Sequence, residues 1–372
     1  MLYHLFRWLN EQHGFPYFVR YPSFRIAAAF VTSLAFCILF GPAFIRWLRR
    51  RNVGENLTKL GQERREIVPD GKAGTPTMGG LLTGAALLMG AVLWCRLDQP
   101  LVICGLAVFV VAAAIGLWDD SVKLFHPTRP GISFATKMIA FTALGFGVGL
   151  ALQLWLWRDG PESGLRVLVL PFLKDVFLDL RVWFGIPFLL LVFLAICGSA
   201  NAVNLTDGMD GLAAGCLAIA GIAMTAMNYI VGDETFASRF FVLYVDGGQE
   251  VAVLLAALVG ASLGFLWFNA APAQLFMGDV GSLPFGALLG YSAVASRMEL
   301  GLLLVGGVFV IEAASVLIQV ASYKLRHKRV FLCTPIHHHF QKQNVPETKI
   351  VVRFWCVAIV LAVSSIALFK VR

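Results

Sequence analysis

Two adjacent carboxylates and a lysine follow a long apolar run. Residues 101–118 are almost entirely apolar, and Asp119, Asp120 and Lys123 come directly after them. Such a run is long enough to cross the hydrocarbon core of a bilayer, so the charged groups are expected where a membrane helix meets water. Adjacent carboxylates repel each other, and a divalent cation bound by their oxygens would remove that repulsion. A solvated helix end is the alternative reading.

A second acidic segment repeats polar side chains at intervals of three residues. Asn204, Asp207 and Asp210 would share one face of a helical turn and offer ligands for a metal, a base or a sugar. Alternatively, one of the two aspartates caps the helix that follows. One cap explains one residue and not three, so the pattern favours a functional site.

Two further segments add candidate ligands. Residues 70–80 are rich in glycine, which lets backbone N–H groups approach a phosphate, and Lys72 adds a positive charge. These glycines could instead permit close helix packing. Residues 268–282 contain Asn269, Asp279 and Phe276, which is either a stacking platform for a ring or an aromatic residue of the membrane interface.

Three consecutive histidines, His337, His338 and His339, lie in a basic segment near the C-terminus. They cannot all face one metal ion, and no cysteine or carboxylate is spaced to complete a zinc site. Contact between one or two of them and a phosphate is the more plausible role. Few ionisable or amide groups fall inside apolar runs, and those that do are expected to face protein or water: Lys137, Glu312 and Gln319.

The composition indicates an all-α polytopic membrane protein. Hydrophobic residues make up 58% of the 372 residues and charged residues only 14%. Ten segments are expected to span the bilayer as helices of a single domain, residues 1–372: 24–47, 77–95, 99–118, 133–157, 182–200, 211–231, 250–268, 282–297, 300–323 and 350–369. The net charge of +8 is distributed next to these segments, which favours anionic lipid headgroups and an anionic ligand over nucleic acid. The seven cysteines show no metal-binding or disulfide spacing.

Ten spans place both termini on one side of the membrane and the polar loops described above on the other. Basic residues are more frequent in this second set of loops, which makes that side cytoplasmic. On the opposite side, residues 165–181 partly alternate around a proline-containing turn and predict a short β-hairpin.

Together these motifs resemble those of the polyprenyl-phosphate N-acetylhexosamine-1-phosphate transferases. The similarity rests on Asp119 and Asp120 followed by Lys123, on residues 204–210 and on residues 276–282. Residues 74–80 (GTPTMGG) and 334–340 (TPIHHHF) are similar, more narrowly, to the branch that transfers phospho-N-acetylmuramoyl-pentapeptide. The motifs extend over nearly the whole chain. Gln341 departs from the pattern, in which a glutamate is expected.

The resemblance implies a magnesium-dependent reaction in the bacterial inner membrane. UDP-N-acetylmuramoyl-pentapeptide would react with undecaprenyl phosphate to give the undecaprenyl-diphosphate-linked sugar and UMP. The implied fold has ten membrane helices, periplasmic termini, a periplasmic hairpin and a cytoplasmic active-site cleft, usually in a homodimer.

The resemblance also implies roles for single residues. Asp279 is expected to be the principal Mg²⁺ ligand, with Asp119 or Asp120 as a second ligand or as the group that orients or deprotonates the lipid phosphate. The expected phosphate contacts are Lys123 and His337. The remaining candidates are expected to bind substrate, chiefly its uridine part: Lys72, Lys137, Asn204, Asp207, Asp210, Asn269, Phe276, Gln319, His338 and His339.

Two other functions are compatible with parts of the pattern. A sister enzyme that transfers N-acetylglucosamine-1-phosphate to the same lipid would share the acidic motifs, but residues 74–80 and 334–340 argue against it. An ion-coupled transporter would carry acidic groups in the middle of broken helices, whereas most of these acids gather at one membrane face.

Overall fold

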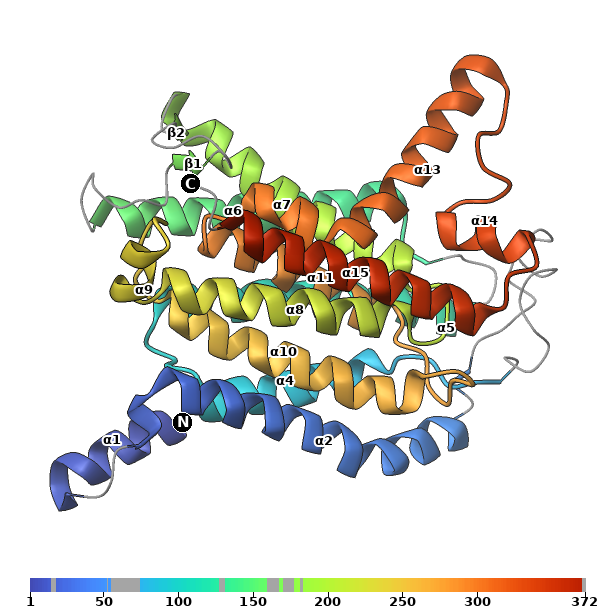
Figure 1. Cartoon of the computed structure of the whole chain (residues 1–372). Helices are drawn as coiled ribbons and strands as arrows, with labels where there is room; N and C mark the ends of the chain where they lie inside the picture. Colours follow the sequence, from blue (N-terminus) through green and yellow to red (C-terminus); the bar gives the residue numbers. More distant parts are fainter. Residues whose placement is uncertain are drawn as a thin grey trace.

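The computed structural model describes residues 1–14, 18–51, 53–54, 74–126, 131–158, 167–169, 177–180 and 183–369. Most of this part of the chain is helical (Figure 1). The elements, in chain order, are α1 (Leu2–His13), η1 (Phe18–Arg20), α2 (Pro22–Arg50), α4 (Gly80–Trp94), α5 (Pro100–Phe125), α6 (Phe134–Arg158), β1 (Val167–Val169), β2 (Phe177–Asp179), η5 (Trp183–Gly185), α7 (Ile186–Thr206), α8 (Leu212–Val231), α9 (Glu234–Arg239), α10 (Gly248–Asn269), α11 (Asp279–Ala295), α12 (Glu299–Val305), α13 (Gly307–Arg326), α14 (Ile336–Lys342) and α15 (Glu347–Phe369).

Nine of the ten apolar segments predicted from the sequence coincide with one helix each, and the tenth, residues 300–323, coincides with α12 and α13. Among the described residues, eight helices are long and apolar enough to cross a membrane: α2, α5, α6, α7, α8, α10, α13 and α15. The other two, α4 and α11, have 15 and 17 residues. At about 1.5 Å per residue they are shorter than a hydrocarbon core of about 30 Å. The structure therefore supports a multi-pass membrane protein with eight clear candidate spans.

Helix boundaries differ from the predicted ones where the site forms. Helix α5, which corresponds to the predicted span 99–118, continues to Phe125. Asp119 and Asp120 therefore lie inside a helix. The predicted span 300–323 is broken at Gly306 into α12 and α13. Two consecutive glycines, Gly306 and Gly307, weaken the helix at this point because glycine has a low helix propensity.

Two helices form the centre of the bundle. Helix α10 packs against α2, α4 and α8, and α11 packs against α5 and α7. Every residue from Val280 to Ala295 of α11 is buried. A helix that is apolar on all sides must be covered by protein or by lipid. Neighbouring helices cover both α10 and α11.

The two ends of the bundle carry different elements (Figure 1). Met1, the end of α15, α9 and the two strands lie at one end, whereas α14 lies at the other, beside the start of α15. Strands β1 and β2 form an antiparallel pair with Val167 opposite Asp179, so the predicted hairpin is confirmed. All seven cysteines are free thiols.

Candidate active site

Three carboxylates from two helices meet at the end of the bundle where α14 lies. Asp119 and Asp120 lie in the last two turns of α5, and Asp279 is the first residue of α11. The helices approach closely at Gly116, where an added Cβ would lie 2.6 Å from the carbonyl carbon of Asp279 and 2.8 Å from Cα of Val280. No side chain larger than that of glycine fits this contact, so Gly116 allows the carboxylates to come together.

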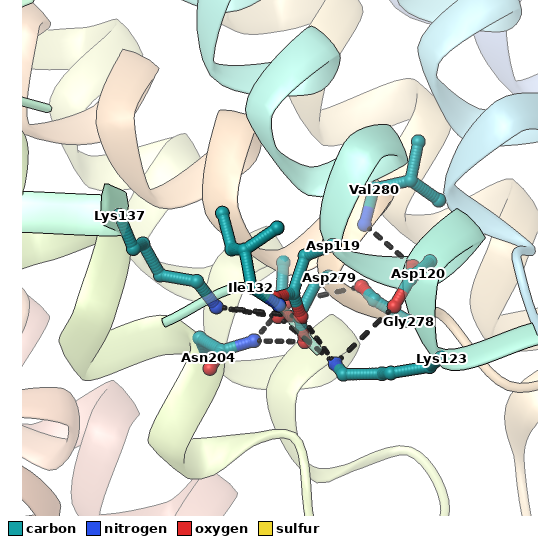
Figure 2. A network of polar contacts seen from close by, with 10 residues as sticks. Asp119, Asp120, Lys123, Ile132, Lys137, Asn204, Gly278, Asp279 and Val280 are labelled. Atoms are coloured by element: carbon teal, nitrogen blue, oxygen red, sulfur yellow. Dashed lines mark hydrogen bonds and ion pairs between the residues drawn. The ribbon is translucent and has the colours of Figure 1, made fainter. Parts of the chain in front are cut away.

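Each carboxylate uses one oxygen for a hydrogen bond that fixes its orientation (Figure 2). Oδ1 of Asp119 accepts the Ile132 N–H at 2.9 Å, and Oδ2 of Asp120 accepts the Val280 N–H at 2.9 Å. Oδ1 of Asp279 accepts a hydrogen bond of 2.7 Å from the Asn204 side chain. These bonds leave one oxygen of each carboxylate directed toward a shared point.

The ammonium group of Lys123 lies at that point. Its Nζ is 2.6 Å from Oδ2 of Asp119, 3.1 Å from Oδ2 of Asp279 and 3.4 Å from Oδ1 of Asp120. A second lysine, Lys137 from the first turn of α6, places its Nζ 2.8 Å from the same Asp279 oxygen. Three negative charges therefore face two positive ones in a site where Asp119 and Asp120 are almost fully buried.

The three carboxylates could hold a metal ion. One ligand atom from each lies within 4.8 Å of the others. Carboxylate oxygens are the ligands that hard divalent cations prefer, and the convergence of three of them around a cationic group is the arrangement such a cation requires. Because Lys123 is partly exposed, at 36% of its side-chain surface, its flexible side chain can leave this point without breaking the packing of the core.

Asn204 belongs to this site, but the expected helical face with Asp207 and Asp210 is wrong. Helix α7 ends at Thr206, so the three side chains do not continue along one helix. Asn204 reaches Asp279 and also donates to the Ser282 hydroxyl at 2.9 Å. Neither aspartate caps the following helix, since α8 begins after Gly211 without a side-chain cap.

Hydrogen bonds of Asp210 and Asn269 join the segment after α7 to the segment after α10. Oδ2 of Asp210 accepts the Ala273 N–H at 3.0 Å. The Asn269 side chain accepts the Gly211 N–H and donates to the Leu275 carbonyl, both at 2.9 Å. Asp210 and Asn269 therefore shape the loops beside the carboxylates. Asp207 follows the last turn of α7 and is half-buried.

The segment that precedes Asp279 is anchored to the glycine-rich segment. The Phe276 N–H donates to the Pro76 carbonyl, and the Gly79 N–H donates to the Phe276 carbonyl, both at 2.8 Å. The Phe276 side chain is half-buried. Lys72, the predicted cation of the glycine-rich segment, lies outside the described residues.

The three histidines form the first turns of α14. His337 and His338 are buried with ring centroids 4.1 Å apart, and His338 is 3.0 Å from Gln341. His339 accepts the Leu332 N–H at 3.1 Å. The Gln319 side chain accepts the N–H groups of residues 330 and 331 at 2.9 and 3.0 Å and donates to the Phe331 carbonyl. His339 and Gln319 thus both hold the loop between α13 and α14.

Sequence reasoning missed several groups that shape this site. The Ile132 N–H and the Val280 N–H are backbone donors, and no residue type signals such a donor. Ser282 was visible at three residues after Asp279, the spacing at which helical side chains are neighbours. Gly116 was visible next to the carboxylates, but its close contact with Asp279 depends on how α5 and α11 pack.

The sequence was then compared with known proteins. Residues 102–297 match the family described as glycosyl transferase family 4, a range that includes Asp119, Asp120, Asn204 and Asp279. Residues 72–82 match phospho-N-acetylmuramoyl-pentapeptide-transferase signature 1. Together with the helical bundle and its acidic site, the first match defines the class, a multi-pass membrane protein of glycosyl transferase family 4.

Relatives over the full length narrow this class. The chain is 40% identical to phospho-N-acetylmuramoyl-pentapeptide-transferase of Psychrobacter cryohalolentis over 376 residues, which cover 100% of both chains. It is 45% identical to the protein of that name from Ruegeria pomeroyi and 44% identical to that from Bartonella quintana, over 95% of each chain. The chain therefore belongs to the phospho-N-acetylmuramoyl-pentapeptide-transferase family.

Proposed function

We propose that the chain transfers phospho-N-acetylmuramoyl-pentapeptide from its UDP-linked donor to undecaprenyl phosphate. The products are UMP and undecaprenyl-diphosphate-linked N-acetylmuramoyl-pentapeptide, or lipid I, in the first membrane step of peptidoglycan synthesis. The names of the full-length relatives and the signature in residues 72–82 support the substrates. The single observation that supports the chemistry is the convergence of three carboxylate oxygens around the ammonium group of Lys123.

The charge on the site suits the proposed reaction. A phosphate oxygen of the lipid must attack the sugar-bearing phosphorus of a diphosphate, so two anions have to be brought together in line. Mg²⁺ held by Asp279 and Asp119 would offset the charge that develops on the departing UMP. The hydrogen bonds from Asn204 and the Ile132 N–H hold these two carboxylates in place before substrate binds.

The two lysines take complementary roles in this proposal. Lys123 is the more exposed of the two and binds a phosphate oxygen once it leaves the point where the carboxylate oxygens converge. Lys137 stays beside Asp279 and limits the negative charge of the empty site. Asp120, whose outer oxygen is 3.4 Å from Lys123, orients that lysine or the lipid phosphate.

The remaining predicted residues bind the donor in this proposal. The loops that Asp210 and Asn269 join form the floor of the uridine site, with Asp207 and Phe276 beside them. Phe276 stacks on the uracil ring, and Lys72 contacts the diphosphate. His337 contacts a phosphate oxygen, and His338, His339 and Gln319 hold the surrounding loop.

The finer topology is part of the same proposal. Helices α4 and α11 also cross the membrane, because neighbouring helices surround them and they need not match the bilayer thickness alone. Ten crossings then place both termini in the periplasm and the site at the cytoplasmic face of the bacterial inner membrane. The chain acts there as a single-domain protomer of a homodimer.

Reconstitution tests the proposed reaction. Purified protein is mixed with UDP-N-acetylmuramoyl-pentapeptide and undecaprenyl phosphate, with Mg²⁺ or with a chelator, and UMP and lipid product are measured. We expect product only with metal, and a loss of at least about 100-fold in Asp279→Asn, since one ligand oxygen is lost. Asp233→Asn is the matched control, because Asp233 also accepts a hydrogen bond from a side-chain amide, that of Gln249 at 3.2 Å, but lies at the α9 end of the bundle.

Several outcomes would contradict the proposal. Product from UDP-N-acetylglucosamine alone would support the sister enzyme, and uptake of a solute into vesicles without lipid product would support a transporter. Isolation of a phosphorylated aspartate would replace direct attack with a covalent route, whereas inversion at phosphorus would exclude that route. Labelling of Cys333, on the α13–α14 loop, from the periplasmic side would reverse the orientation.

A further inference from the structure

A buried carboxylate–histidine pair joins α13 to the triple-histidine segment. Glu312 lies on α13 and His337 lies in the first turn of α14, and both side chains are completely buried. Oε2 of Glu312 is 3.1 Å from the ring Nδ1 of His337, with a longer contact of 3.5 Å to the backbone N–H of the same residue. One oxygen therefore faces the ring and the backbone of His337 together.

This pair sets the orientation of the His337 ring. The Glu312 carboxylate lies beside Nδ1, and Nε2 lies at the opposite edge of the ring. Among the described residues, neither ring nitrogen has a partner in hydrogen-bonding geometry. Glu312 therefore holds the ring through the close contact at Nδ1, which leaves Nε2 directed away from Glu312.

The Nε2 edge of the ring faces the loop that follows α7. An added Cβ on Gly208 would collide with Nε2 and lie 2.9 Å from Cε1 of His337. Gly208 stands between Asp207 and Asp210, in the loop beside the carboxylates. The orientation of the His337 ring therefore also sets the position of this loop.

Fold stability does not explain why two polar groups are buried here. Removing an ionisable pair from water is costly, and apolar side chains of similar volume often replace such a pair without loss of stability. The pair instead imposes one orientation on His337, which a pair of apolar side chains would not do.

We propose that Glu312 is a positioning residue that holds the His337 imidazole with Nδ1 toward α13 and Nε2 toward the loop containing Gly208. This inference rests on the proposed function, because its effect is read through the transfer reaction. Glu312 does not touch substrate and acts only through His337.

A double-mutant cycle tests this role. We expect Glu312→Met to lower kcat about 10- to 100-fold, with KM for the donor within about threefold, by analogy with lost outer partners of functional histidines. Glu312→Gln should recover most of the activity, because a glutamine side chain has the same shape and can keep a polar oxygen beside Nδ1. In a His337→Ala background, Glu312→Met should have no further effect. Gly208→Ala should lower kcat in the same direction as Glu312→Met.

Glu299→Gln is the matched control, because Glu299 is another buried helix carboxylate and pairs with Arg297 at 3.4 Å. We expect its kcat to equal that of the wild type. ¹⁵N spectra of histidine-labelled protein give an independent readout, in which the Nδ1 signal of His337 shifts in Glu312→Met but not in Glu299→Gln. If Glu312→Met does not fold, Glu312→Ala and its double mutant with His337→Ala carry the same additivity comparison, and Gly208→Ala tests the other side of the His337 ring.

The inference is overturned if Glu312→Met keeps wild-type kcat, or if its effect is undiminished in the His337→Ala background. A wild-type protein that makes no lipid product would overturn the proposed function instead. The two failures are distinguishable because the second occurs before any residue is changed.

Discussion

Gly116→Ala should move Asp279 on α11 away from Asp119 and Asp120 on α5. The added Cβ would lie 2.6 Å from the carbonyl carbon of Asp279 and 2.8 Å from Cα of Val280. Carbon atoms in contact prefer about 3.5–4.0 Å, so the start of α11 must move about 1 Å away from α5. Both contacts are with backbone atoms, and rotation of a side chain cannot relieve them.

The expected effect on the reaction follows from this displacement. A shift of about 1 Å between reacting or metal-binding groups can lower a rate about 100-fold. We expect a fall of this size in the initial rate of UMP release at saturating substrate, together with a higher Mg²⁺ concentration for half-maximal rate. Overpacking should also lower the free energy of unfolding by about 1–3 kcal/mol.

Gly198→Ala provides the control for glycine replacement in a helix. Gly198 lies on α7, the helix of Asn204, and an added Cβ there meets nothing within 4 Å. Its activity should stay within about twofold of the wild type, and alanine should stabilise the helix by up to about 1 kcal/mol. A folded Gly116→Ala protein with wild-type rate and wild-type Mg²⁺ dependence would refute the reasoning about this contact.

Two further substitutions test other parts of the structure. Lys137→Met removes the ammonium 2.8 Å from Asp279 and leaves the site more negative. The site should then need less Mg²⁺ for half-maximal rate, while KM for the anionic donor rises about 10-fold, which corresponds to about 1.4 kcal/mol. A rise in the Mg²⁺ requirement would contradict this. Arg25→Met leaves Glu250 buried without the guanidinium that now donates to it at 2.5 and 2.6 Å. We expect the free energy of unfolding to fall by about 3–5 kcal/mol in thermal unfolding, and Glu250→Leu in the same chain to restore most of it. Equal losses in the single and double variants would show that the pair is not the cause.

Much of the fold was predictable because the bilayer limits what a chain can do. Long apolar segments must form helices to satisfy their backbone groups in lipid, so all ten segments are helical, and residues 300–323 are divided between two helices. The hairpin was also predictable, from alternation around a proline-containing turn. The ends of the helices were less predictable, since α5 continues for a further two turns into the polar segment.

The site was predictable in its members and less so in its arrangement. Asp119, Lys123 and Asp279 were identified by residue type and by resemblance, and they do meet. The role of Asn204 was not visible, because its spacing suggested a shared face with Asp207 and Asp210. In the structure α7 ends between them, and Asn204 turns toward α11 while Asp210 turns toward residue 273.

By itself, the sequence determined which segments enter the membrane and which charged side chains stay at its edge, because hydrophobicity and spacing are local properties. Tertiary packing decided which oxygen of each carboxylate points to the shared site. That choice depends on the approach of α11 at Gly116 and on backbone donors at Ile132 and Val280. Tertiary packing also decided that Glu312 contacts His337, 25 residues later in the chain. A contact between separate helices has no signature in the sequence spacing of either helix.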